Sequence, residues 1–193
     1  LEAQSNRKLH FRSTVIDTHN DILTTALSEG YSFDQNLKGK THSDLARWKE
    51  GGIDVQIFSV WCDGTYGPGK AFALANRQID TLYATVNRNP DKISITTTPE
   101  QMRSNLRAGK ISAMIGVEGG HMIEDNLFYL DSLYRRGVRY MTLTWNNSTS
   151  WATSAMLETT KKDSLKQKGL TDFGKQVVKR MNELGMIVDV SHV

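Results

Sequence analysis

"ISAMIGVEGGHMIEDNLFYLDSLYRRGVRYMTLTW", residues Ile111 to Trp145, decides the fold class of this chain. It opens with a continuous apolar run that ends at Glu118 and closes with a second β-rich run, residues 139–145. Between them, residues 124–136 carry leucines on one helical stripe and are followed by Gly137, a favourable residue for ending a helix. The stretch therefore predicts a strand, a helix and a parallel strand in succession.

The same alternation runs through the rest of the chain. Further strands are predicted at residues 14–19, 55–61 and 186–193, further helices at residues 71–87 and 171–184, and a shorter turn at residues 99–108. The last of these helices has Thr171 as a candidate N-cap and Gly185 at its end. Two polar regions, residues 29–40 and 149–168, are expected to be long loops. Repeated βα units with nearly continuous apolar strands predict an α/β fold whose parallel sheet is covered on both faces.

The chain length decides between two versions of this fold. A TIM (β/α)8 barrel typically needs about 250 residues, whereas this chain has 193 and ends on a predicted strand. An open doubly wound fold is one interpretation. The other is the front part of a barrel, covering roughly its first five strands, with the rest absent or supplied by another chain. We expect one domain over residues 1–193, with residues 1–13 as an N-terminal extension.

Composition and charge exclude several function classes. The chain is 38% hydrophobic and 23% charged, as expected for a folded domain. Its net charge of +3 is too weak to indicate nucleic-acid binding, and no apolar run approaches the roughly 20 residues of a membrane span. The lone Cys62 excludes an internal disulfide and is expected to be a half-buried thiol. The start "LEAQSNRKLH" lacks an initiator Met, which favours a processed, secreted or periplasmic protein over a cytoplasmic one.

Four potential metal ligands stand at the ends of predicted strands. His19 and Asp21 occupy alternate positions in "VIDTHNDIL", Glu118 ends the 111–118 strand before two glycines, and His192 ends the last strand. Each alone is more often a structural polar residue. Together they occupy the strand ends where barrel enzymes place their active sites, and their side chains suit zinc. His19 and Asp21 would hold one cation and His192 another, with Glu118 bridging them and the second cation one ligand short.

The remaining histidines and one aspartate receive lesser roles. His10 and His42 are expected at the surface, and His121 either lines the rim of the site or is structural. Asp189 is expected either to support a ligand histidine or to bind backbone groups at the strand end.

These residues lie in motifs that resemble the membrane dipeptidase (renal dipeptidase) family, peptidase family M19. The segment "VEGGHMIEDNLFYLDSLYRRGVR", residues 117–139, follows the family signature throughout, and "IDTHND", "YMTLTWNNSTSWA" and "GLTDFGKQVVKRMNELGMIVDVSHV" are similar as well. The resemblance covers nearly the whole chain from Val15. It implies a (β/α)8 barrel with a binuclear zinc centre that hydrolyses dipeptides, with tolerance of a C-terminal D-residue in many members, and it makes a homodimer plausible.

The resemblance also implies roles for individual residues. His19 and Asp21 would bind one zinc, His192 would bind the other, and Glu118 would bridge both, so that a metal-bridging hydroxide attacks the peptide carbonyl. The family's further zinc-binding His, a substrate-carboxylate Arg and a late-strand Asp lie beyond the last residue here. Where mammalian members have a substrate-binding His, this sequence has Trp145. Trp145 and Asn146 are the candidate substrate-binding residues. Either Asn146 or Asn147 takes over the hydrogen bond to substrate, or the specificity differs.

Two other function classes remain as alternatives. One is a non-catalytic or incomplete barrel fragment that binds metal or peptide without turnover. The other is a different barrel amidohydrolase, although these commonly open with H-x-H and this chain has His19-Asn20-Asp21. Five strands alone cannot close a barrel, so we expect the exposed sheet edge to drive association with the missing half or with a second copy, and little activity without it.

Overall fold

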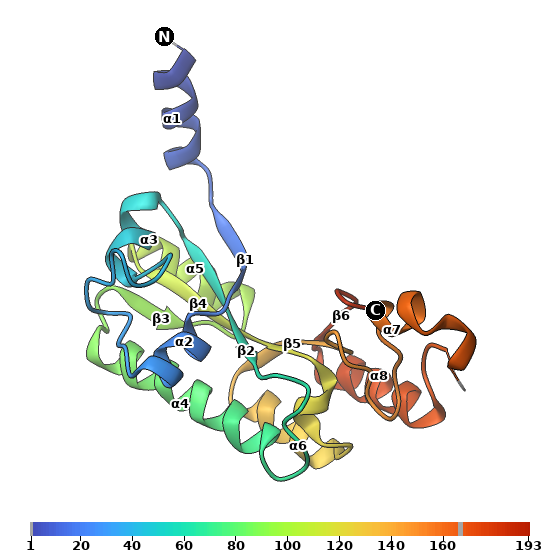
Figure 1. Ribbon diagram of the computed structural model, residues 1–193. Coiled ribbons are helices and arrows are strands. Elements are labelled where there is room, and N and C mark those ends of the chain that lie inside the picture. The colour runs from blue at the N-terminus through green and yellow to red at the C-terminus, as the bar shows by residue number, and fades with distance from the viewer. Residues whose placement is uncertain (1, 166–167) are drawn as a thin grey trace. The chain divides into compact units, whose positions relative to one another are not determined.

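The computed structural model describes residues 2–165 and 168–193, in which helices and parallel strands alternate (Figure 1). The chain forms two compact units. The first contains the residues up to 59 and residues 80–114, and the second contains residues 60–79 and those from 115 onward. Three elements run from one unit into the other: β2 (Val55–Trp61), α4 (Ala71–Arg88) and β4 (Ile111–Glu118).

The strands pair in parallel in the order β1-β2-β4-β5-β6, and the short strand β3 also pairs with β4. In the first unit, β1 (Ile16–Asn20) pairs with β2, and β3 (Ile93–Ile95) pairs with β4. The helices of this unit besides part of α4 are α1 (Glu2–Arg12), α2 (Ile22–Glu29), α3 (Leu45–Gly51) and α5 (Pro99–Arg107). Its core is built around three aromatic rings, Phe33, Trp48 and Phe58, with centroids 5.4–5.7 Å apart.

In the second unit, β5 (Val138–Thr142) pairs with β4 on one side and with β6 (Ile187–Asp189) on the other. Its helices are η1 (Gly120–Ile123), α6 (Leu127–Arg135), α7 (Ala155–Thr160), η2 (Lys162–Ser164) and α8 (Asp172–Leu184). Helices α6 and α8 pack side by side against β5 and β6. Arg180 of α8 donates two hydrogen bonds, of 2.7 and 3.0 Å, to the carboxylate of Asp131 of α6. This pairing lowers the pKa of Asp131.

The strands at residues 55–61 and 111–118 have the bounds that their apolar runs predict. The last helix is also as predicted, because the Thr171 side chain accepts a hydrogen bond from the Gly174 N–H and Gly185 ends the helix at φ 71°. Helix α6 begins later than predicted, at Leu127. Asn126 caps it, and the preceding residues Glu124 and Asp125 have positive φ.

Other elements differ from the predictions. Strand β6 ends at Asp189 because the Asp189 carboxylate accepts hydrogen bonds from the N–H and hydroxyl of Ser191, which turns the chain. Strand β3 and helices α2 and α3 are too short to give a clear periodic pattern, and none was predicted. The expected 149–168 loop contains α7 and η2, and the expected N-terminal extension contains α1.

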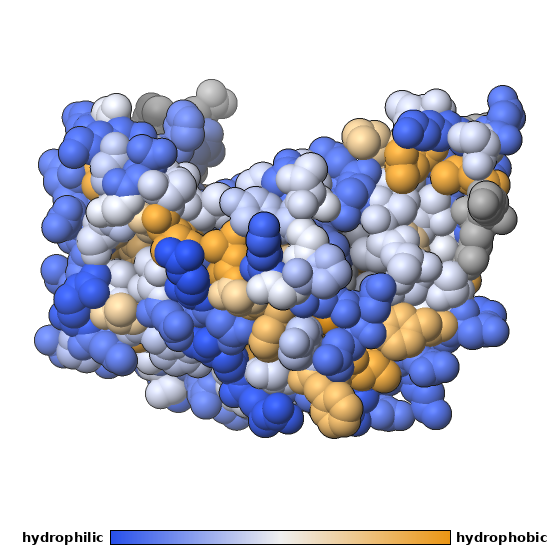
Figure 2. Space-filling view, turned by 60° about the horizontal axis from the view of Figure 1, so that its bottom comes forward, coloured by the Kyte–Doolittle hydropathy of each residue, from blue (hydrophilic) through white to orange (hydrophobic). Residues whose placement is uncertain are grey.

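In the part of the chain that the structure describes, no helix is long and apolar enough to cross a membrane. Figure 2 shows one face of the molecule, on which hydrophilic residues predominate and apolar areas lie between them.

Candidate metal centre

His19 and Asp21 meet at the end of β1, in the first unit. His19 Nε2 lies 3.3 Å from Asp21 Oδ1, and both side chains are exposed, at 41% and 55%. Asp21 follows the strand, because β1 ends at Asn20. Asp21 occupies the N-cap position of α2, yet its side chain makes no capping bond. Asn20 caps the helix by accepting from the Ile22 N–H, so the Asp21 carboxylate is left to face His19.

The surroundings of Asp21 keep its carboxylate ionised. A hydrogen bond from His19 lowers the pKa of Asp21, partial burial opposes this, and the charge of His19 and a hydrogen bond from Ser59 lower it further. His19 and Asp21 also line a pocket of about 330 Å³ together with residues 40–43. His42, exposed as expected, belongs to this pocket lining.

Glu118 and His192 meet in the second unit. Glu118 is the last residue of β4 and is only 8% exposed, whereas His192 lies three residues beyond the end of β6. Glu118 Oε1 lies 3.0 Å from His192 Nε2. A carboxylate buried at the end of an apolar strand is costly unless a positive group meets it. The sequence predicts His192 on the last strand, but in the structure it lies beyond the end of β6. It still reaches the carboxylate that the sequence places at the end of the 111–118 strand.

Both residue pairs fit zinc in chemistry and spacing. Two ligands of one tetrahedral zinc ion stand roughly 3.3 Å apart when each metal–ligand bond is about 2.0 Å long. The His19–Asp21 and Glu118–His192 contacts, at 3.3 and 3.0 Å, are close to that spacing. In addition, the second ring nitrogen of His192 faces Asn146 Oδ1 at 3.2 Å, so both nitrogens face oxygen acceptors. With the proton on Nδ1, the Nε2 lone pair and the Glu118 carboxylate both face the place where a cation would bind.

The candidate substrate-binding residues follow β5. Trp145 is half-buried and contacts Trp61 edge to face, with ring centroids 5.0 Å apart. Trp145 also lies close to Gly119, where φ is 105° and a Cβ atom would come within 3.3 Å of the Trp145 Cβ and collide with His121. Asn147 packs over Gly64, and its Oδ1 atom is buried with no hydrogen-bond partner in the described part of the chain.

His121, Asp189 and His10 make structural contacts. His121 Nε2 donates to the Cys62 carbonyl at 3.0 Å, and burial lowers the pKa of His121. Cys62 is fully rather than half buried, at 2% exposure. The Asp189 carboxylate accepts hydrogen bonds from the hydroxyls of Thr142 and Ser191, and so links β5 to the turn after β6. His10 is exposed and contacts the Gly51 carbonyl at 2.7 Å.

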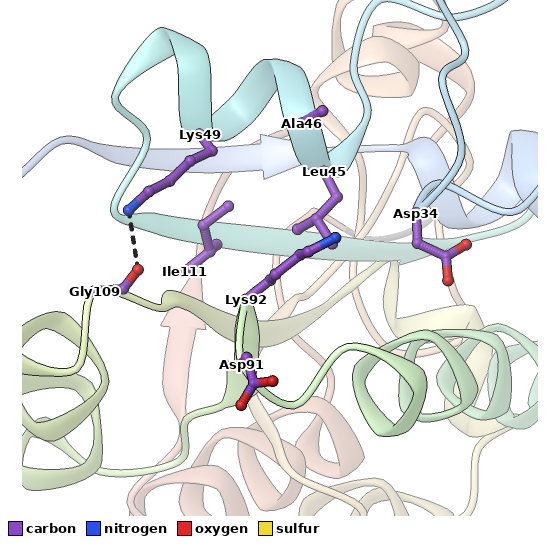
Figure 3. A pocket seen from close by; sticks show the side chains of 8 residues that line it. All are labelled: Asp34, Leu45, Ala46, Lys49, Asp91, Lys92, Gly109 and Ile111. Atoms are coloured by element: carbon purple, nitrogen blue, oxygen red, sulfur yellow. Dashed lines mark hydrogen bonds between the residues drawn. The ribbon is translucent and has the colours of Figure 1, made fainter.

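A second pocket of the first unit, of about 380 Å³, lies at the amino ends of β3 and β4 (Figure 3). Its lining includes Lys49, which donates to the Gly109 carbonyl at 2.9 Å, and also Lys92, Asp34 and Asp91. Because His19 and Asp21 lie at the carboxyl end of β1, this pocket is separate from the candidate metal ligands of the same unit.

Sequence reasoning did not identify the groups that hold these ligands in place. Ser59 binds Asp21, Thr144 donates to the His192 carbonyl at 2.9 Å, and Asn146 contacts the His192 ring. Their only signal in the sequence was their place in or just after the last residues of predicted strands, which does not distinguish a supporting role from a direct one.

Solved structures share this fold. A metallopeptidase from Rhodobacter sphaeroides, bound to a phosphinate mimic of the dipeptide L-Ala-D-Ala, matches with a TM-score of 0.82 and 20% identity, over 93% of this chain and 59% of that one. Dipeptidase AC, described as a metallopeptidase of family M19, matches with a TM-score of 0.79 and 23% identity, over 93% and 56%. The probable dipeptidase PvdM from Pseudomonas aeruginosa matches with a TM-score of 0.76 and 22% identity, over 98% and 49%.

The likeness to these structures shows that the parallel α/β fold is part of a TIM barrel, as predicted. This chain spans between 49% and 59% of their lengths. The family model described as membrane dipeptidase (peptidase family M19) matches residues 3–193. Since this match extends over almost every residue, the chain belongs to the membrane dipeptidase family, peptidase family M19.

Proposed function

We propose that the protein is a zinc-dependent dipeptidase and that this chain supplies the first part of its metal centre. Membership of the family supports this proposal, as does the dipeptide mimic bound to the Rhodobacter sphaeroides structure. The observation that carries it is the contact of 3.0 Å between the buried Glu118 carboxylate and His192. A buried carboxylate beside an imidazole, with the second ring nitrogen already committed, has the chemistry of a zinc ligand set.

In this proposal, His19 and Asp21 would hold one zinc ion, His192 would hold the other, and Glu118 would be a ligand of both. When bound, zinc supplies Lewis-acid chemistry, which activates water at neutral pH and stabilises negative charge on the carbonyl oxygen of the peptide bond. The chain's own residues orient the ligands. Because Glu118 is almost fully buried, its negative charge is weakly screened and attracts cations strongly.

Trp145 and Asn146 are the proposed substrate contacts. The edge-to-face pair of Trp145 and Trp61 offers a rigid apolar wall for a side chain of the dipeptide. The NH2 group of Asn146 has no hydrogen-bond partner among the described residues and is available to donate to a substrate carbonyl. A C-terminal D-residue is among the substrates we expect. Secretion or a periplasmic location, and a homodimer, stay predictions.

The test replaces Glu118 by Gln in the full-length protein, which keeps the size of the side chain and removes its charge. We expect bound zinc to fall from about two ions per subunit and dipeptide hydrolysis to drop by at least about 100-fold. Glu50→Gln, at an exposed residue of α3, is the matched control and should retain both. Unchanged hydrolysis in Glu118→Gln would refute the bridging role. Zinc binding without turnover in the unmodified protein would favour the non-catalytic alternative.

A further inference from the structure

The backbone of His192 is held by hydrogen bonds that do not involve its ring. The His192 carbonyl accepts two hydrogen bonds of 2.9 Å, from the Thr144 hydroxyl and from the Ala155 N–H. These bonds hold the residue at φ 67°, in the left-handed region that side-chain-bearing residues rarely adopt. The turn after β6 is therefore fastened to the segment that follows β5, and the imidazole ring leaves the backbone at a defined place.

The ring itself is held at both nitrogens. Nδ1 lies 3.2 Å from Oδ1 of Asn146, and Nε2 lies 3.0 Å from Oε1 of Glu118. An amide oxygen can only accept a hydrogen bond, so this contact requires a proton on Nδ1. In the neutral ring the lone pair is then on Nε2, which is the atom that faces Glu118. A metal ligand must present a lone pair in this way, and a metal-bound histidine usually donates its other N–H to a fixed acceptor.

Asn146 is well placed to act as that acceptor. Its own carbonyl accepts a hydrogen bond of 2.8 Å from the Ser154 hydroxyl, and Ser154 is fully buried. The hydroxyl of Ser154 also caps α7 by accepting from the Leu157 N–H. Asp189 is the other residue that the sequence suggests as a partner for the His192 ring, but its carboxylate accepts hydrogen bonds from the hydroxyls of Thr142 and Ser191.

We propose that Asn146 is a positioning residue for His192: its carboxamide oxygen accepts the Nδ1 proton, fixes the tautomer and directs the Nε2 lone pair at the metal position beside Glu118. The proposal rests on the assignment of His192 as a zinc ligand under the proposed function. It gives the two polar groups of Asn146 separate tasks, because the oxygen is committed to His192 while the NH2 group stays available for substrate.

The first experiment measures zinc affinity in the full-length protein by competition with a chelator, for the wild type and for Asn146→Leu and Asn146→Asp. Loss of an outer partner of a ligand histidine typically weakens metal binding by about 10–100-fold. We expect Asn146→Leu to weaken one of two zinc-binding steps by that factor. Asn146→Asp keeps an acceptor oxygen, so its affinity should stay within about threefold of the wild type or increase. An equal loss in both variants would overturn the proposal.

Two further variants separate this proposal from the proposed function. His192→Ala identifies the zinc-binding step to which His192 contributes. If His192→Ala changes neither step, the assignment of His192 as a ligand is wrong. If His192→Ala removes a step that Asn146→Leu leaves unchanged, only the positioning role is wrong. Asn147→Ala is the matched control, because Asn147 packs over Gly64 rather than against His192, and it should leave both steps unchanged.

A measurement on the unmodified protein avoids any dependence on the folding of the variants. In the zinc-loaded protein, NMR of the ring nitrogens of His192 should show a proton on Nδ1 that exchanges slowly with water and a deprotonated Nε2. A proton on Nε2, or an Nδ1 proton in fast exchange with water, would overturn the proposal.

Discussion

Glu118 and His192 stand 74 positions apart in the sequence, and their side chains meet at 3.0 Å. Glu118 is the last residue of β4, while His192 lies in the turn after β6. Strand β5 lies between β4 and β6 in the sheet. Binding of a cation at this contact would therefore join the turn after β6 to the end of β4. Metal binding and stability of the second unit should consequently be coupled.

This coupling predicts that zinc stabilises the protein. At a free zinc concentration 100 times the dissociation constant, a ligand that binds only the folded state raises the free energy of unfolding by about 2.7 kcal/mol. We expect an increase of this size in urea unfolding between protein treated with EDTA and protein resupplied with zinc. The combined variant Glu118→Gln/His192→Ala should lose most of the increase, and an undiminished increase would show that zinc acts elsewhere.

Cys62 is predicted to be unreactive in the folded protein. Burial raises the pKa of its thiol to about 12, and the charges of Asp63 and Glu124 add to this effect. At pH 9 a thiol with that pKa is on the order of 0.1% thiolate, whereas an ordinary cysteine is mostly thiolate. Alkylation by iodoacetamide at pH 9 should therefore be at least about 100-fold slower in native protein than in urea. Equal rates would contradict the buried, protonated state.

Asp34 is predicted to make stability depend on pH below about 4. Burial alone would raise its pKa, but hydrogen bonds from Arg88, Ser32 and Asn89 outweigh it and hold the pKa at about 2. A carboxyl with a depressed pKa contributes stability above its unfolded value of 3.8, and this contribution is lost as the pH falls from there to about 2.

Asp34→Asn should remove that pH dependence and cost about 1–3 kcal/mol at neutral pH, because Arg88 loses its charged partner. Urea unfolding between pH 7 and pH 2 is the measurement. Asp91→Asn is the control, since Asp91 lines the same pocket but is exposed, and it should change stability by less than about 0.5 kcal/mol. Parallel stability–pH curves for Asp34→Asn and the wild type would contradict the prediction.

The sequence predicts the strands well where the hydrophobic signal is long. The runs that form β2 and β4 are seven and eight residues long and mostly apolar, and this predicts their bounds. Strands β3 and β6 have three residues each, too few for a periodic signal, and a carboxylate turn at Asp189 ends β6 early. The sequence could therefore place Glu118 at a strand end but could not foresee that His192 reaches it from a turn.

The supporting contacts of the candidate site could not be predicted for a different reason. Asn146 and His192 are 46 positions apart, and the family resemblance indicated Asn146 as a substrate contact. The orientation of the Asn146 carboxamide depends on the Ser154 hydroxyl and on the turn that contains His192. Neither contact produces a recognisable pattern in the sequence around Asn146. The metal-ligand roles of His19, Asp21, Glu118 and His192 stay a prediction that the experiments above address.

Gly116 is predicted to be required for packing in the middle of β4. It is paired with Tyr140 of β5, and a Cβ atom at Gly116 would come within 1.9 Å of the Tyr140 ring, which is 7% exposed. An added methyl group must therefore displace a buried aromatic ring, and overpacking of this kind typically costs about 1–3 kcal/mol. Gly116→Ala should lower the free energy of unfolding by that amount in urea denaturation.

The control for Gly116→Ala is Gly51→Ala at the end of α3, where an added Cβ would meet nothing within 4 Å. Since alanine favours helix over glycine by up to about 1 kcal/mol, Gly51→Ala should be neutral or stabilising. Combining Gly116→Ala with Tyr140→Ala tests the cause. The ring is then absent, so the second substitution should make Gly116→Ala nearly free of cost, and the two changes should deviate from additivity by more than about 0.5 kcal/mol. Strict additivity would show that Gly116 is constrained by something other than the Tyr140 ring.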